Sequence, residues 1–457
     1  MKKRIATFLL AMLMVISMGC ARNQAQDSGT TTQETQETQT SQSQVSEPEE
    51  EIVLTFRTNM GTDDISSSRD WITRVASEFM AVNPNIKIEL DHVDTESHRN
   101  KLKIEMAGGN PPDIIFTWGL DYSAPDAEAG MLLDLTPYLN ADPEMKNVLL
   151  DVAWEAFTYD GKIMGAGIHG FTEGLFYHKE VFAQLGLTKV ETYDEFLNAI
   201  EAAKNAGITP IAAGLKDRWA ADFFAPMIFD RMCGYDMYQK IMNGEEKFLN
   251  DDYVLAAKMV QELAAMDAFS QSATGISYAE AYTILGTGQA LLMGDGSWSI
   301  QTYQSDAFEE GTADKIGFIN FPAIPNGKGD QKSLIYGVAP GYALSGKLSG
   351  SREAAAVSFF KKMMSKESMI SFLEIESPIV PIAGEIDMSN ISSNLFKEVM
   401  VVLSESTFQY DPYNDTMLPG LAEVWHDVHV ELMDKISGST AEELLQRLDD
   451  AYNEFYQ

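Results

Sequence analysis

The sequence is poor in cysteine and in histidine, and both scarcities exclude classes of site. It contains two cysteines among 457 residues, Cys20 and Cys233, too few for a disulfide-stapled scaffold. A lone cysteine is usually a buried apolar residue, so we expect Cys233 to lie in a core. The six histidines are scattered, and His426 and His429, three residues apart, lack an H-E-x-x-H pattern. We therefore expect a solvated helix face at these two histidines, no metal site and no cofactor.

Positive charge is also scarce. The chain carries 33 Lys and Arg residues against 68 Asp and Glu residues, which gives a formal net charge of -35. Such a surface repels the phosphates of nucleic acids and the headgroups of anionic lipids. We therefore expect no nucleic-acid partner, and the negative charge also argues against an anionic ligand.

Motifs for nucleotide binding and nucleophilic catalysis are incomplete or missing. The stretch GAGIHG matches G-x-G-x-x-G at Gly165, Gly167 and Gly170, but FTEGLFYHK follows as a strand, where a dinucleotide site needs a helix. Its glycines indicate a chain crossing between two lobes instead. No serine has glycine two residues before and two residues after it, the pattern of a nucleophile elbow. A glycosidase would need two carboxylates at a defined separation, which a sequence does not display.

The N-terminus has the features of an export signal. A basic segment, Lys2 to Arg4, precedes a mostly apolar segment over residues 5–18, which predicts a signal peptide at residues 1–19. The ending ISMGC resembles a bacterial lipoprotein signal, which implies that Cys20 is lipidated; ordinary cleavage is the alternative, because Ser17 stands where that signal prefers an aliphatic residue. Residues 20–50 are rich in Gln, Thr, Ser and Glu and predict a disordered tether. After the first twenty residues no apolar run resembles a membrane span.

From residue 51 onward, short apolar runs alternate with helical patterns. IVLTFRTN, IKIEL and PDIIFTW predict strands, and SSSRDWITRVASEFMAVNP predicts a helix between the first two. A second set, from about residue 172, predicts strands at GLFYHKEVF, ITPIAAG and ALLMGDG, with a helix capped by Thr192 and Glu195 and ended at Gly207. The pattern predicts an α/β fold with two lobes. In such folds, ligands bind at the carboxyl ends of strands and between domains.

The six tryptophans give the sharpest functional signal. Trp71 and Trp154 fall in helical patterns and are expected in the core. Four others follow a strand end or a turn: Trp118, Trp219, Trp298 and Trp425. Each taken alone is more simply structural, but together they predict an aromatic-lined cleft. Flat rings cover the apolar face of a sugar, while Asp, Asn and Glu form hydrogen bonds with its hydroxyls.

The chain resembles the extracellular solute-binding protein family 1, the sugar-binding subunits of ATP-binding-cassette (ABC) importers related to maltose-binding protein. The resemblance covers residues 52–456 and rests on the order and spacing of GGNPPDIIFTWG, DGKIMGAGIHGFTEGLFYHKEVFAQLGL with TYDEFL, ALLMGDGSWS, FPAIPNGKG and AAAVSFFKKMMS. It implies a two-lobe periplasmic-binding-protein-like fold with a hinge and an inter-lobe ligand cleft. We expect lobe one at residues 51–168 plus 312–340, and lobe two at residues 169–311 plus 341–457.

The expected ligand site combines the strand-end pattern with what the resemblance implies. It consists of nine residues: Trp298, Trp425, Trp118, Asp121, Trp219, Asp295, Glu173, His169 and Asn59. Trp298 and Trp425 match tryptophans that stack on sugar in maltose-binding relatives. Trp118 and Asp121 match a tryptophan and an aspartate of the opposite lobe. The histidine and the glutamate of the set compete for one polar position near the first crossing.

The resemblance implies capture of a mono- or oligosaccharide between the lobes, hinge closure and delivery to a membrane permease, without enzymatic activity. The protein is then expected to be a monomer, held by the lipid on Cys20 at the extracellular face of a bacterial cell membrane. Two alternatives stay open. One is a secreted glycoside hydrolase with the same aromatic cleft, and the other is a binding protein for a non-sugar solute such as a peptide or a polyamine.

Overall fold

The computed structural model describes residues 50–59, 68–376, 379–384 and 391–456. Residues 50–457 form one compact unit. The expected signal peptide, the expected lipid site Cys20 and the tether up to residue 49 lie outside the described residues. Within the described part of the chain, no helix combines the length and the apolar character needed to cross a membrane.

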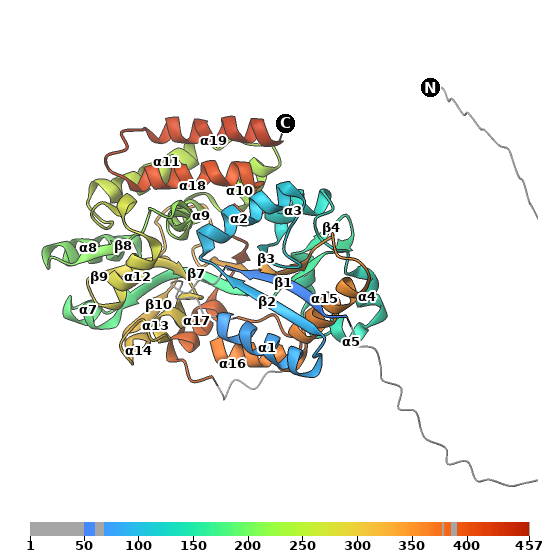
Figure 1. Ribbon diagram of the computed structural model, residues 1–457. Coiled ribbons are helices and arrows are strands. Elements are labelled where there is room, and N and C mark those ends of the chain that lie inside the picture. The colour runs from blue at the N-terminus through green and yellow to red at the C-terminus, as the bar shows by residue number, and fades with distance from the viewer. Residues whose placement is uncertain (1–49, 60–67, 377–378, 385–390, 457) are drawn as a thin grey trace, which may run out of the picture. The chain divides into compact units, whose positions relative to one another are not determined.

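The chain forms two principal sheets and a small hairpin, with helices between the strands (Figure 1). The strands are β1 (Ile52–Thr58), β2 (Ile86–His92), β3 (Ile114–Trp118), β4 (Thr158–Tyr159), β5 (Lys162–Ile163), β6 (Gly165–Gly167), β7 (Phe171–His178), β8 (Thr209–Ala212), β9 (Ala290–Gly296), β10 (Ile316–Ile319), β11 (Leu334–Gly337), β12 (Pro340–Leu344) and β13 (Gln409–Tyr410). The α-helices are α1 (Ser68–Val82), α2 (Thr95–Gly108), α3 (Leu120–Glu128), α4 (Thr136–Ala141), α5 (Pro143–Lys146), α6 (Asp151–Glu155), α7 (Lys179–Gln184), α8 (Tyr193–Asn205), α9 (Ala225–Cys233), α10 (Tyr235–Met242), α11 (Asp251–Ala265), α12 (Tyr278–Gly286), α13 (Ser299–Gln304), α14 (Thr312–Lys315), α15 (Gly350–Met363), α16 (Lys366–Glu376), α17 (Asn394–Glu405), α18 (Pro419–Met433) and α19 (Ala441–Tyr456). Short 3-10 helices are η1 (Arg218–Phe223), η2 (Ala273–Gly275) and η4 (Tyr413–Thr416).

The first sheet has the strand order β2-β1-β3-β12-β6. β1 runs parallel to β2 and β3, so the carboxyl ends of these three strands meet at one edge. β12 enters between β3 and β6 and is antiparallel to both. Helices α1, α15 and α16 pack together against this sheet. Trp71 of α1 is completely buried and Trp154 nearly so, which confirms that both belong to the core.

The second sheet has the strand order β13-β11-β7-β9-β8 and is built around β7. β9 pairs antiparallel with one side of β7, while β11 and β10 share the other side. β8 is parallel to β9, so the carboxyl ends of these two strands point the same way. Helices α11, α18 and α19 lie side by side (Figure 1). The two sheets confirm the predicted α/β class with two sheet-containing lobes.

Three strands lie in a different sheet from the one expected. We expected residues 312–340 in lobe one, yet β10 and β11 pair with β7 of the second sheet. We expected residues 341–457 in lobe two, yet β12 completes the first sheet and α15 packs on β1. The expectation was wrong for these segments because the partner of a strand is a long-range choice. The apolar patterns of the three strands do not encode it.

The chain crosses between the sheets at residues 168–170, again at residues 338–339, and a third time between α16 and α17. The first crossing follows β6 of the first sheet and precedes β7 of the second, so the GAGIHG stretch is a crossing, as predicted. The backbone N–H groups of Ile168 and His169 both lie 3.1 Å from the carbonyl oxygen of Pro340 and donate to it. The first crossing is therefore hydrogen-bonded to the start of β12, directly after the second crossing. Gly167 permits this approach, because a Cβ atom there would lie 1.8 Å from the carbonyl oxygen of Val338.

Capping boxes start two helices near the second sheet. Thr192 and Glu195 cap α8, and the positive φ of Gly207 follows its end, as predicted. Ser277 and Glu280 cap α12 in the same way. This second box places Tyr278 at the first position of α12.

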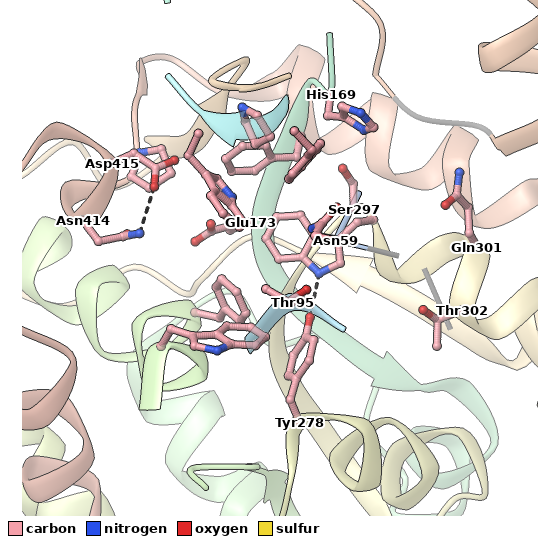
Figure 2. Close-up of a pocket in the computed structure, with 18 of the residues that line it drawn as sticks. Asn59, Thr95, His169, Glu173, Tyr278, Ser297, Gln301, Thr302, Asn414 and Asp415 are labelled. Carbon is pink, nitrogen blue, oxygen red and sulfur yellow. Dashed lines mark hydrogen bonds between the residues drawn. The ribbon is translucent and has the colours of Figure 1, made fainter. Parts of the chain in front are cut away.

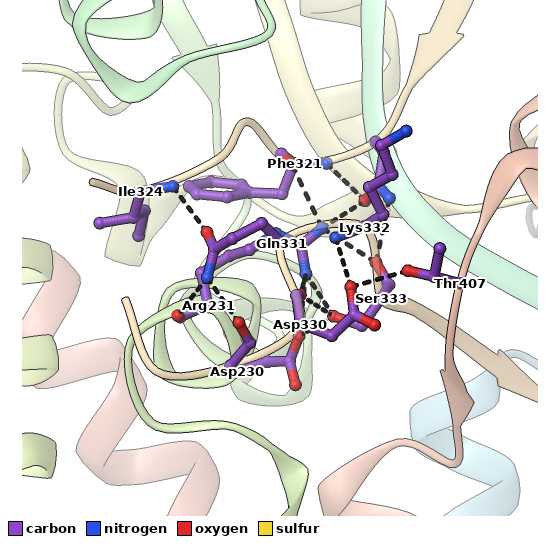
Figure 3. Close-up of polar contacts among 11 residues, drawn as sticks. Asp230, Arg231, Phe321, Ile324, Asp330, Gln331, Lys332, Ser333 and Thr407 are labelled. Carbon is purple, nitrogen blue, oxygen red and sulfur yellow. Dashed lines mark hydrogen bonds and ion pairs between the residues drawn. The ribbon is translucent and has the colours of Figure 1, made fainter. Parts of the chain in front are cut away.

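A buried arginine fixes the connection between β10 and β11 (Figure 3). Arg231, near the end of α9, donates through Nη1 to Asp230 at 2.9 Å and to the hydroxyl of Ser333 at 2.5 Å. Its Nη2 donates to the side-chain oxygen of Asn320 at 2.8 Å. The amide of Gln331 donates back to the carbonyl oxygen of Arg231 at 2.8 Å. These bonds tie both ends of the loop at residues 320–333 to α9.

Candidate ligand-binding pocket

A pocket is formed by residues from both sheets, at the carboxyl ends of their strands (Figure 2). Asn59 follows β1, Thr95 follows β2 and Trp118 ends β3. Trp298 follows β9 of the second sheet. The described residues that line the pocket are Asn59, Thr95, Arg99, Phe116, Trp118, His169, Gly170, Phe171, Glu173, Trp219, Phe223, Tyr278, Ala279, Tyr282, Ser297, Trp298, Gln301, Thr302, Pro340, Pro412, Asn414 and Asp415. Six of the nine expected site residues are therefore brought together.

Trp298 stands at the centre of the aromatic part of this lining. Its indole nitrogen Nε1 donates to the hydroxyl of Tyr278 at 2.6 Å. Its ring lies 5.1 Å from that of Phe171 and 5.0 Å from that of Phe223 between centroids. The side chain is half-buried, so part of the ring is free to meet a bound molecule.

A second aromatic group stands beside Trp298. The ring of Trp219, on η1, lies 5.6 Å from Phe223 and 4.8 Å from Tyr278. Trp219 is half-buried, as Trp298 is. The second sheet and its helices thus supply a continuous aromatic wall, in which two tryptophans were expected and the other rings were not.

The ring of Trp118 is less accessible to a ligand than its place at a strand end predicted. It is 8% exposed, and the guanidinium carbon of Arg99 lies 4.0 Å from its ring centroid. This is cation–π geometry, so a cation already covers part of the ring. Arg99 comes from α2, and nothing in the sequence pattern singled it out.

Two carboxylates border the pocket on the side of the second sheet. Glu173, on β7, is 4% exposed and accepts no hydrogen bond from any side chain that the structure describes. Burial raises the pKa of Glu173 well above its usual value, and the nearby carboxylates of Asp415 and Asp222 raise it further. Burial also raises the pKa of Asp415 to about 7, against the opposing charge of Arg99. Both groups are acceptors for hydroxyl donors, or donors themselves when protonated.

His169 and Glu173, the two candidates for one polar position, both line the pocket. His169 lies on the first crossing, and its Nε2 is 3.4 Å from the hydroxyl of Tyr342. Burial lowers the pKa of His169 to about 3, so its ring is neutral at physiological pH. The glutamate is therefore the acidic group of this pair, and the histidine is a neutral neighbour.

Three expected residues do not line the pocket. Trp425 is 0% exposed and packs in the core against Phe229, Phe248 and His429. Asp295 is also completely buried, and Asp121 lies exposed on α3 outside the lining. For Trp425 the expectation was wrong because the LPG stretch before it begins a helix. Trp425 falls on the buried face of α18 with residues such as Leu421.

His426 and His429 are buried, so the predicted solvated helix face was wrong. Nδ1 of His426 lies 2.6 Å from one oxygen of Asp222, and Nδ1 of His429 lies 2.7 Å from the other. The aspartate comes from η1, far away in the sequence, which is why no local pattern revealed it. In the described ranges, no group of three His, Cys, Asp or Glu side chains is placed to hold a metal ion. Cys233 is buried as expected.

Comparisons with known proteins agree on one family. The family model described as "Bacterial extracellular solute-binding protein" matches residues 65–370. The multiple sugar-binding protein of Streptococcus mutans is 24% identical over 331 residues, which cover 68% of this chain and 72% of that protein. The melibiose/raffinose/stachyose-binding protein MelE of Bacillus subtilis is 25% identical over 207 residues, which cover 45% of this chain and 40% of that protein. A solved structure of a chitin oligosaccharide binding protein is 27% identical with a TM-score of 0.80, covering 88% of this chain and 98% of that chain.

Proposed function

Since the chain belongs to the family of bacterial extracellular solute-binding proteins, we propose that it captures a mono- or oligosaccharide in its pocket and delivers it to the permease of an ABC importer. The observation that carries this proposal is the pairing of an aromatic wall with buried carboxylates. Trp298 and Trp219 offer ring surfaces to the C–H face of a pyranose. Glu173 and Asp415 offer oxygens to its hydroxyls.

Unpartnered polar atoms around the pocket support a ligand with many hydroxyls. Oδ1 of Asn59, Nε of Arg99 and Nε1 of Trp219 are buried without a hydrogen-bond partner in the described parts of the chain. A buried polar group without a partner costs about 1–3 kcal/mol. A sugar carries hydroxyl groups, each both a donor and an acceptor, on most of its ring carbons, so it matches such a mixed set of groups better than an apolar solute does.

We also propose that the ligand closes the two lobes by rotation about the crossings. Support comes from the lining, because Asn59, Arg99 and Trp118 belong to the first sheet side, and Glu173 and Trp298 to the second. A ligand that contacts both sides is bound more tightly in the closed form and therefore shifts the population toward it.

A glycoside hydrolase is the second candidate, and the same two carboxylates favour it. Glu173 and Asp415 are buried acids with raised pKa values at one pocket, which is the chemistry that glycosidases use. We propose binding without turnover, because the chain belongs to a family of solute-binding proteins. Incubation with fluorescently labelled oligosaccharides tests this, since the release of shorter sugars would contradict it.

A ligand panel tests the sugar proposal directly. Thermal-shift measurements would cover melibiose, raffinose, stachyose, xylo-oligosaccharides and chito-oligosaccharides, with putrescine and a tripeptide as non-sugar members. A sugar present at about 100 times its dissociation constant should stabilise the protein by about 2.7 kcal/mol. Isothermal titration of the best member would then give its affinity. A shift with putrescine or the tripeptide alone would contradict the proposal.

For the N-terminus we propose cleavage before Cys20 and lipidation of its thiol. The lipid would hold the protein, itself a monomer in this proposal, at the outer face of the membrane. The support is the ISMGC ending and the Gln-, Thr- and Ser-rich segment after it. Mass spectrometry of the mature N-terminal peptide tests this proposal. The Cys20→Ser variant should be released into the medium, and an unmodified Cys20 in the wild-type peptide would contradict it.

A further inference from the structure

The hydroxyl of Tyr278 borders the pocket, yet its hydrogen bonds are made inside the protein. It donates to Oδ1 of Asp295 at 2.5 Å and accepts from Nε1 of Trp298 at 2.6 Å. The hydroxyl of Tyr282 lies 2.5 Å away and completes its surroundings. A phenol has one hydrogen to donate, and here that hydrogen is committed to the aspartate. The hydroxyl therefore has no hydrogen left to donate to a ligand.

Both ends of this chain of hydrogen bonds are fixed to secondary structure. Asp295 is completely buried on β9, and its Oδ1 also accepts from the backbone N–H of Gly296 at 2.8 Å. Tyr278 begins α12, and its backbone N–H donates to Oδ2 of Asp217 at 2.8 Å. The hydroxyl therefore has a fixed position relative to the strand that leads to Trp298.

The indole of Trp298 is held by a second contact of a different kind. A Cβ atom added to Gly296 would lie 2.2 Å from the Cη2 atom of the indole, so the ring lies directly against this glycine. The edge of the ring is held by Tyr278 and its face by Gly296. Within the four residues DGSW, Asp295 thus supplies the carboxylate that holds Tyr278, Gly296 leaves space for the ring, and Trp298 supplies the ring itself.

We propose that Tyr278 is a positioning residue of the pocket: its hydroxyl, held by Asp295, fixes the indole of Trp298 in the orientation in which it meets the ligand. The ligand contacts the indole and makes no hydrogen bond to the tyrosine hydroxyl. This inference rests on the proposed function, in which Trp298 stacks on the bound sugar. Fixing the ring beforehand raises affinity, because binding then orders fewer side-chain rotamers.

The first test needs no ligand. Protein labelled with 5-fluorotryptophan gives one fluorine resonance for each tryptophan, and the Trp298→Phe variant assigns that of Trp298. Tyr278→Phe should shift and broaden this resonance while leaving that of the core residue Trp71 unchanged. An unchanged Trp298 resonance in Tyr278→Phe would overturn the proposal.

A matched control is available in Tyr303. This tyrosine is also buried near α12, with its ring 5.6 Å from that of Tyr282, and its hydroxyl has no hydrogen-bond partner among the described residues. Tyr303→Phe should therefore leave the Trp298 resonance in place. An equal disturbance in both variants would show a general loss of packing and would overturn the positioning role.

The second test separates positioning from direct contact by a double-mutant cycle, with raffinose and stachyose as probes in titration calorimetry. Tyr278→Phe should weaken binding about tenfold in the wild-type background and less than about twofold in the Trp298→Ala background. Gly296→Ala, which displaces the ring without touching the hydroxyl, should behave in the same way. An equal loss in both backgrounds would show that Tyr278 contacts the ligand itself and would overturn the proposal. If neither probe nor any other panel sugar binds the wild-type protein, the proposed function fails, and the fluorine spectra still decide whether Tyr278 positions Trp298.

Discussion

Trp298 and Trp425 have opposite surroundings, although both follow a Gly- or Pro-containing turn in the sequence. Trp298 follows a strand that ends at the pocket, so its position in the chain predicted its place. Trp425 follows a proline that begins helix α18, and it lies on the face of that helix that packs in the core. Local patterns therefore identified the rings at strand ends. They did not identify Arg99, Phe223 or Asp415, because those reach the pocket through long-range packing.

Replacing Trp298 by alanine should weaken binding of the best panel sugar by about thirtyfold, or on the order of 2 kcal/mol. A stacked ring contributes about 0.5–1.5 kcal/mol beyond its buried area, and covering the sugar face adds the remainder. The fold should change little, because the ring is half-buried at the pocket. Titration calorimetry and a melting curve on the same sample measure both quantities.

Trp425→Ala is the matched control for that experiment. Truncating this fully buried ring should cost about 3–5 kcal/mol of the free energy of unfolding. Sugar affinity of the folded protein should stay close to the wild-type value. If Trp298→Ala instead destabilises the fold as Trp425→Ala does while retaining sugar affinity, Trp298 is a core residue and the site assignment is wrong.

Asp415 should make the free energy of unfolding fall as pH rises, which is the opposite of the effect of a carboxylate in an ion pair. Burial raises its pKa from 3.8 to about 7, so between these values the folded chain holds a proton that the unfolded chain has lost. The contribution of this group to the free energy of unfolding therefore falls as pH rises from 4 to 7. An asparagine does not titrate, so Asp415→Asn should gain stability relative to the wild type over this range. Urea denaturation at pH 4, 5, 6, 7 and 8 measures the difference, and a difference that is constant with pH would contradict the assignment.

At the scale of elements, helix boundaries were predictable and strand partners were not. The capping box of α8 and the glycine after it are local signals, read within one or two turns of chain. The assignment of β10, β11 and β12 to sheets depends on pairing with strands far away in the sequence. The same limit applies to Arg231, because its partners lie about 90 to 100 residues further along the chain, with Asn320 and Ser333 as examples.

The buried arginine gives the prediction at this scale. Arg231→Met should lower the free energy of unfolding by about 3–5 kcal/mol, because it leaves Asp230 buried without its cation and frees the loop between β10 and β11. Urea denaturation measures this loss. Lys258→Ala is the control, since Lys258 forms an exposed ion pair with Glu442 and should change stability by at most about 1 kcal/mol. Equal effects of the two variants would contradict the structural role of Arg231.

At the scale of the whole molecule, the order of strands in the first sheet leads to a prediction about fragments. β12 lies between β3 and β6, so the sheet is complete only when residues 340–344 are present. A fragment of residues 50–339 contains β1, β2, β3 and β6 but leaves a gap in the middle of their sheet. We expect it to lack cooperative unfolding and dispersed amide NMR signals, and we expect both for residues 50–457. Native-like dispersion in the fragment would contradict this expectation.

The place of β12 also has a consequence for the order of events while the chain is being synthesised. During synthesis, the first 339 residues are made before the strand that joins β3 to β6 exists. The first sheet therefore cannot close until 344 of the 457 residues have been made. Until residues 340–344 have been made, the edges of β3 and β6 that β12 will join stay unpaired, and unpaired strand edges are templates for pairing with another chain.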